Sequence, residues 1–132
     1  MKQTPMSAPP TPPREVVELV EVIDEERIVE RGTAQVNWFV RQNDGWVHVS
    51  AWPGALSERL DAGAGTVWQS RTQLHVPRGT YFMRVESRPS TYAREEPLDY
   101  LTRGAPSKSR KTRRNYYTAG RAGELCRAAG EP

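Results

Sequence analysis

The chain has 132 residues, of which 36% are hydrophobic and 27% charged, and its formal net charge is +3. This length fits one domain with a modest core, and the four tryptophans argue against a disordered chain. No apolar run approaches the roughly 18 residues that span a bilayer, and the start "MKQTPMSAPPTPPRE" lacks the apolar stretch of a secretion signal. These features predict a soluble, cytoplasmic protein without a membrane partner.

The net charge conceals a strong polarity along the chain. Residues 14–31 hold three arginines against seven acids, which gives −4, whereas residues 101–132 hold eight basic residues against two acids, which gives +6. Such asymmetry bears on partners and association rather than on fold. Whether the acidic segment masks the basic one, within one molecule or between copies, stays open at this stage.

The first predicted elements are an arm and a strand. Residues 1–13 form a Pro-rich arm that we expect to be extended or disordered, because proline cannot occupy a helix interior or a central strand. In residues 14–31 the spacing of Val16, Val20 and Ile23 also fits a helix face, so periodicity alone leaves helix and strand open. The density of β-branched residues favours a strand.

The next element is a predicted hairpin that turns at Asp44-Gly45 and pairs Val40 with Val49. Its apolar face collects Val36, Trp38, Val40, Val47, Val49 and Ala51. Its opposite face collects Phe39, Arg41, Trp46, His48 and Trp52. The stretch "ALSERLDAG" that follows, residues 55–63, has leucines at helical spacing and predicts a short helix or helical turn.

A second hairpin is predicted to turn at Arg78-Gly79. It pairs Val76 with Tyr81, Leu74 with Met83, and Thr72 with Val85. Its opposite face collects Phe82, His75, Arg71, Arg84 and Arg88. We expect the most buried positions of the two hairpins to include Trp38, Val40, Val49, Leu74, Met83 and Val85.

These elements predict a mainly β fold, a small barrel or sandwich of about five or six strands. One or two short helices accompany the strands, the second of them at "PLDYLTRG", residues 97–104. The expected organisation is an arm over 1–13, a β-rich domain over 14–105 and a basic C-terminal segment over 106–132 that packs partly on the domain.

The basic segment is the sharpest functional signal. The stretch "PSKSRKTRRNYYTAGR", residues 106–121, contains six cations, two tyrosines and no acid. Cations neutralise phosphates and aromatic rings stack on bases, so this composition favours nucleic acid. The candidate binding residues are Lys108, Arg110, Lys111, Arg113, Arg114, Tyr116, Tyr117 and Arg121, with Arg84 and Arg88 from the sheet.

Each of these signals also has a structural interpretation. Another segment can cover the aromatic and arginine-rich sheet faces, and Arg71 opposite Glu86 reads as an ordinary cross-strand ion pair. The basic stretch can be a solvated loop, or can be held by the acids of residues 15–30.

Catalysis has little support in the sequence. His48 and His75 are the only histidines, and neither stands at zinc-ligand spacing from the single cysteine, Cys126. No nucleophile elbow or phosphate-binding Gly-rich loop is present. We therefore expect no enzyme, no cofactor and no metal.

The leading hypothesis is a non-catalytic protein that binds single-stranded DNA or RNA with low sequence specificity. The alternative is a structural or accessory subunit of a larger assembly, such as a virion or a ribonucleoprotein, whose charged ends dock on neighbouring proteins. In that case the partner is an acidic protein surface or another copy of the chain.

Overall fold

The computed structural model describes residues 15–90 and 110–132, which form a mainly β fold as predicted. The described residues contain eight strands: β1 (Val17–Val29), β2 (Gly32–Gln42), β3 (Gly45–His48), β4 (Leu56–Arg59), β5 (Thr66–Pro77), β6 (Tyr81–Pro89), β7 (Arg110–Ala119) and β8 (Leu125–Arg127). Two single-turn 3₁₀ helices, η1 (Val49–Ala51) and η2 (Arg121–Gly123), complete this part of the chain. The prediction of five or six strands is therefore too low.

The first helix prediction, for residues 55–63, is wrong. The stretch predicted as helical around Leu56 forms β4, an exposed edge strand that pairs with β5. Its two leucines reflect the sparse pattern of an edge strand rather than a helix face. The predicted arm and the predicted helix at residues 97–104 lie outside the described residues.

β1 settles the ambiguity of the acidic segment in favour of a strand. Its side chains alternate in burial: Glu18, Val20, Val22 and Asp24 are buried, while the residues between them are exposed. This period of two is the signature of a strand with one face on a core. The β-branched residues were the informative signal here.

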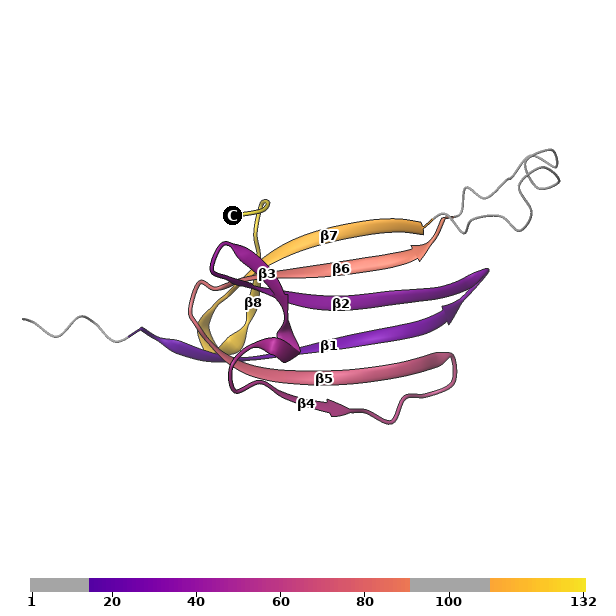
Figure 1. The fold of residues 1–132 in the computed structure, drawn as a ribbon, viewed down its shortest axis with the longest axis horizontal. Coiled ribbons are helices and arrows are strands. Elements are labelled where there is room, and N and C mark those ends of the chain that lie inside the picture. Colours follow the sequence, from indigo (N-terminus) through magenta and orange to yellow (C-terminus); the bar gives the residue numbers. More distant parts are fainter. Residues whose placement is uncertain (1–14, 91–109) are drawn as a thin grey trace, which may run out of the picture.

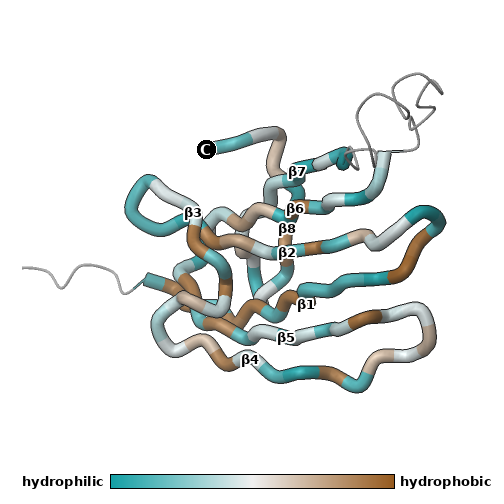
Figure 2. The backbone as a smooth tube through the Cα atoms, turned by 45° about the vertical axis from the view of Figure 1, so that its right-hand side comes forward, coloured by the Kyte–Doolittle hydropathy of each residue, from teal (hydrophilic) through white to brown (hydrophobic). Residues whose placement is uncertain are grey.

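The strands form one curled sheet, shaped like half of a barrel. Their order is β4-β5-β1-β2-β6-β7-β8, with β3 paired to β2 off this path, and the first six lie one above another in Figure 1. Figure 2 shows the same order from a second direction. The core lies at the end of the sheet where the chain passes from β5 to β6, since Leu74, Val76 and Phe82 of the buried cluster flank that turn.

The first hairpin exists, but its register differs from the prediction. Asn43 and Asp44 form the turn, with φ of 48° and 63°, so Gly45 opens β3 and Val40 pairs with Val47 instead of Val49. A two-residue turn with positive φ at both positions has the twist that a hairpin needs, and Asn and Asp tolerate it.

The second hairpin is wrong as predicted, because β5 and β6 are not neighbours. The chain reverses at Arg78-Gly79, but β1 and β2 lie between the two strands. Leu74 pairs with Val20 of β1, and Met83 pairs with Phe39 of β2. The predicted Arg71–Glu86 pair is absent too, since the Arg71 guanidinium contacts Glu21 at 2.9 Å and also Glu58.

The core joins the two sides of the curl. Its buried residues are Val20, Val22, Val40, Val49, Leu74, Val76, Phe82 and Ala119. Of the positions predicted as most buried, Val40, Val49, Leu74 and Met83 are confirmed, whereas Trp38 and Val85 are half-buried. Phe82, placed by the sequence on the polar face, is fully buried, because its strand joins β2 and not β5.

Candidate nucleic-acid interface

The described part of the basic stretch includes the strand β7, and the alternation of its side chains divides the cations between two faces of the sheet. Nine residues of β7 pair with β6, including Arg113 opposite Glu86 and Lys111 opposite Arg88. Residues directly opposite each other point to the same face, and successive residues point to opposite faces. Lys111, Arg113 and Tyr117 therefore share one face with Arg88, while Arg110, Arg114 and Tyr116 lie on the other.

The first of these faces concentrates four cations, which we call the cationic face: Arg84, Arg88, Lys111 and Arg113. All four are candidates predicted from the sequence, and the register brings them together. One acid lies among them, Glu86, so the group carries a formal charge of +3.

Glu86 holds two of these arginines in place. Arg84 Nη1 donates to Glu86 Oε2 at 3.1 Å, and Arg88 Nε lies 3.2 Å from Glu86 Oε1. Lys111 and Arg113 have no such partner, since no carboxylate within the described parts of the chain lies at ion-pair distance from either. Both are exposed and available to an external anion.

A cavity of about 250 Å³ opens beside the paired residues Arg88 of β6 and Lys111 of β7. It is lined by Glu86, Arg88, Pro89, Lys111, Thr112 and Arg113. Three of its six lining residues are cationic, so the hollow suits an anionic group more than an apolar one.

An aromatic pair continues the cationic face toward the core. Trp38 lies opposite Arg84, and its ring centre is 5.4 Å from that of Tyr117. Arg127 of β8, which the sequence analysis did not select, lies over the Tyr117 ring at 5.8 Å and donates to Asn115 at 2.9 Å. Cations and aromatic rings thus follow one another along this face.

The opposite face of β7 uses its residues differently. Arg110 Nη2 donates to the carbonyl oxygens of Thr33 and Ser87 at 2.8 and 3.1 Å, which ties β7 to neighbouring strands. Tyr116 packs against Trp46, with ring centres 5.8 Å apart. Arg114 is exposed on this face with no ion pair among the described residues.

The predicted aromatic and arginine face is also divided. Phe39 and His48 are cross-strand partners whose rings meet edge to face at 5.7 Å, on the face opposite Arg84. Lys108 lies outside the described residues, and Arg121 is exposed in η2, away from the cationic face.

The acids of β1 have partners of their own. Arg78 Nη2 donates to Glu18 Oε1 at 2.6 Å, and this hydrogen bond holds the pKa of the Glu18 carboxyl below its ordinary value. Hydrogen bonds, first that from Gln35, likewise lower the pKa of Glu26. β2 and β6 separate β1 from β7 in the sheet, and the positive charge of Arg110 on β7 is among the smaller causes that lower the pKa of Glu26.

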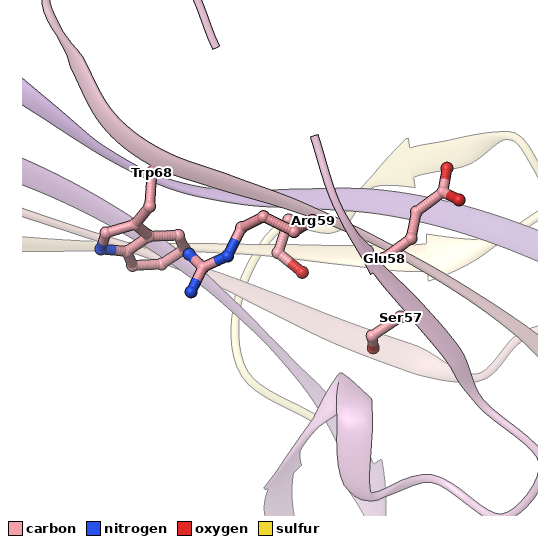
Figure 3. A pocket seen from close by; sticks show the side chains of 5 residues that line it. Ser57, Glu58, Arg59 and Trp68 are labelled. Atoms are coloured by element: carbon pink, nitrogen blue, oxygen red, sulfur yellow. The ribbon is translucent and has the colours of Figure 1, made fainter. Parts of the chain in front are cut away.

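A second hollow lies where β4 ends against β5, with a volume of about 390 Å³ (Figure 3). Its cation, Arg59, lies over the Trp68 ring at 5.7 Å, and Figure 3 shows Glu58 pointing the other way. Trp68 Nε1 also donates to Glu26 at 2.8 Å. This hollow has one cation, Arg59, among its lining residues, so it offers a polyanion less than the cationic face does.

No family model, no curated protein and no solved structure matches this chain. Over residues 15–90 and 110–132, no helix is long and apolar enough to cross a membrane, and no group of three His, Cys, Asp or Glu side chains is placed to hold a metal.

Proposed function

We propose that this protein binds single-stranded nucleic acid with little sequence preference and holds its phosphates on the cationic face. One observation carries the proposal. Arg88 and Lys111 stand directly opposite each other on neighbouring strands, where like charges repel.

The energetics of that pair favour an anionic ligand. A like-charged cross-strand pair weakens the sheet, by an amount on the order of the 0.2–1 kcal/mol that a favourable pair contributes. A phosphate between the two side chains turns the repulsion into two attractions and releases condensed counterions from the nucleic acid. Glu86 is shared between Arg84 and Arg88, and within residues 15–90 and 110–132 no other carboxylate neutralises Lys111 or Arg113.

The aromatic pair supports a single strand rather than a duplex. Unstacked bases can lie on exposed parts of Trp38 and Tyr117 while the phosphates follow the cations, each stacked base contributing ~1–3 kcal/mol. The curved sheet presents no helix of two or more turns to enter a groove among its described residues. Both rings are half-buried, so we expect fewer stacked bases than phosphate contacts.

The test is the salt dependence of binding to a fluorescein-labelled single-stranded oligonucleotide, measured by anisotropy with DNA and with RNA. Replacing Arg88 and Lys111 together by Ala should weaken binding and reduce the log–log salt slope by about 1.4, because each lost contact on a single strand accounts for roughly 0.7. The matched control is Arg114→Ala, which removes the same kind of charge from the other face of β7.

The control variant, Arg114→Ala, should leave the log–log salt slope of binding unchanged. An unaltered slope in the double variant, or an equal loss in Arg114→Ala, would refute the proposed site.

A second candidate is the assembly subunit, and a different surface favours it. Val17, Leu19 and Ile23 of β1 are 55%, 46% and 38% exposed, and Leu56 of β4 is 71% exposed. In this role, the apolar stripe formed by Val17, Leu19, Ile23 and Leu56 packs against a second copy of the chain. Light scattering checks it: a protein that remains monomeric at high concentration and behaves identically as Leu19→Asp has no such interface.

A further inference from the structure

A chain of three hydrogen-bonding side chains lies apart from the cationic face. His48 ends β3, Ser50 follows in η1, and Asp24 lies in the middle of β1. The Ser50 hydroxyl oxygen lies 2.6 Å from His48 Nδ1, and His48 Nε2 lies 3.2 Å from Asp24 Oδ1. A serine, an imidazole and a carboxylate in this order have the geometry of an activated nucleophile.

A neighbouring backbone hydrogen bond fixes the tautomer of the histidine. The Ser50 N–H donates to His48 Nδ1 at 3.2 Å, and a backbone amide can only donate. His48 Nδ1 therefore carries the lone pair, and in the neutral ring the proton resides on Nε2, facing Asp24. The same lone pair can accept the hydroxyl proton of Ser50, which is what a general base must do.

Asp24 is buried, and its environment suits a positioning residue. The side chain is 3% exposed, and its Oδ1 also accepts a hydrogen bond from the backbone N–H of Trp38 at 2.7 Å. Its second oxygen, Oδ2, has no hydrogen-bond partner among the residues that the structure describes. Burial raises the pKa of this carboxyl, and the contacts from Trp38 and His48 oppose that shift. A carboxylate fixed behind the ring orients it and stabilises an imidazolium.

We propose that Ser50 is a nucleophilic serine, that His48 is its general base and that Asp24 positions His48. This activity goes beyond nucleic-acid binding and does not depend on it. Ser50 is exposed and His48 is 35% exposed, so an electrophile can reach both from solvent. The substrate class is an acyl ester small enough to approach the surface at the η1 turn.

The chemical step follows from the hydrogen bonds. Ser50 Oγ attacks the ester carbonyl carbon while His48 Nδ1 takes its proton; the Oγ–C bond forms and the bond from carbon to the leaving oxygen breaks. The proton on Nδ1 then passes to that oxygen, which leaves as an alcohol. Water releases the acyl group by the same steps in reverse, and Ser50 regains its proton.

The experiment uses a fluorophosphonate probe on the full chain, with adducts located by mass spectrometry. The serine oxygen displaces fluoride, an O–P bond replaces the P–F bond, and His48 takes the serine proton. Ser57 is the internal control, because it is also exposed but its hydroxyl bonds Thr72 Oγ1 at 2.8 Å instead of an imidazole. Ser50 should react about 10²–10⁴-fold faster than Ser57, the range that general-base assistance contributes.

Two variants test the roles of the partners. His48→Ala should lose the preferential labelling, and added imidazole should restore part of it, which a purely structural tie does not predict. Asp24→Asn keeps the shape of the side chain and should slow labelling of Ser50 while the chain stays folded by circular dichroism. Labelling of Ser50 no faster than of Ser57 in the unmodified protein would overturn the proposal and leave His48 as a cap of the η1 turn.

Discussion

The two ends of the β6–β7 ladder have opposite chemistry. At one end Phe82 lies opposite Tyr117, and Phe82 is fully buried in the core. At the other end Arg88 lies opposite Lys111, and both are exposed. The same hydrogen-bonded pairing runs through both ends, so their difference lies in the side chains alone. One end stabilises the fold, and that stability permits a row of like charges at the other.

The largest expected effect on the free energy of unfolding is at the end of the β6–β7 ladder that contains Phe82. Phe82→Ala removes a fully buried ring from the centre of the core and should lower the free energy of unfolding by ~3–5 kcal/mol. Chemical denaturation measures this loss. Arg113→Ala is the control from the exposed end, where a surface change should stay within about 0.5 kcal/mol. Comparable losses in the two variants would contradict the division between the ends.

The next effect separates stability from binding at the cationic end. Lys111→Glu replaces a repulsive cross-strand pair with an attractive one, so the free energy of unfolding should rise by about 0.2–1 kcal/mol. Oligonucleotide binding should weaken at the same time, because the cationic face loses two units of positive charge. Thermal unfolding and anisotropy on one sample measure both. A variant that is less stable yet binds as before would show that the pair serves the fold.

The smallest effect concerns acid stability on the other side of the sheet. Arg78 lowers the pKa of Glu18 below 4.5, so this pair stabilises the fold above that value and loses its contribution as pH falls through the folded pKa. Glu18→Gln should therefore flatten the fall in melting temperature below about pH 4.5. Arg114→Ala, which removes an exposed charge that has no ion pair among the described residues, is the control. An unchanged acid profile in Glu18→Gln would mean that the pair is solvated rather than stabilising.

Local signals in the sequence predicted elements better than partners. The β-branched run predicted β1, and the turn residues near Asp44 and Gly79 marked real chain reversals. A turn, however, fixes only where the chain reverses. Whether β6 joins β5 or β2 depends on burial of residues such as Phe82, which local spacing cannot rank.

The candidate residues show the same limit. Lys111 and Arg113 were selected from the composition of the basic stretch, and Arg84 and Arg88 from the alternation of a predicted strand, but their position together on one face follows from the β6–β7 register. The alternation of β7 separates Tyr116 from Tyr117, which the sequence presented as a pair. Asp24 was not selected, because its contact with His48 arises only when β1 approaches the end of β3. Ser50 was not selected either, although its contact with His48 is local. A His-x-Ser spacing was the one available signal, and it is common.

The position of β1 between β2 and β5 shapes the order in which the chain folds. β1 and β2 are joined by a tight turn and can pair at once, whereas Glu18 meets Arg78 sixty positions later in the chain. At about 5–20 residues per second, synthesis needs roughly 2–10 s to bring β5 to the free edge of β1. During that interval the edge is a template for pairing with other chains, and charged side chains are a common defence against it. Glu18 and Glu21, which later pair with Arg78 and Arg71, place charges of this kind on β1 before those partners are synthesised.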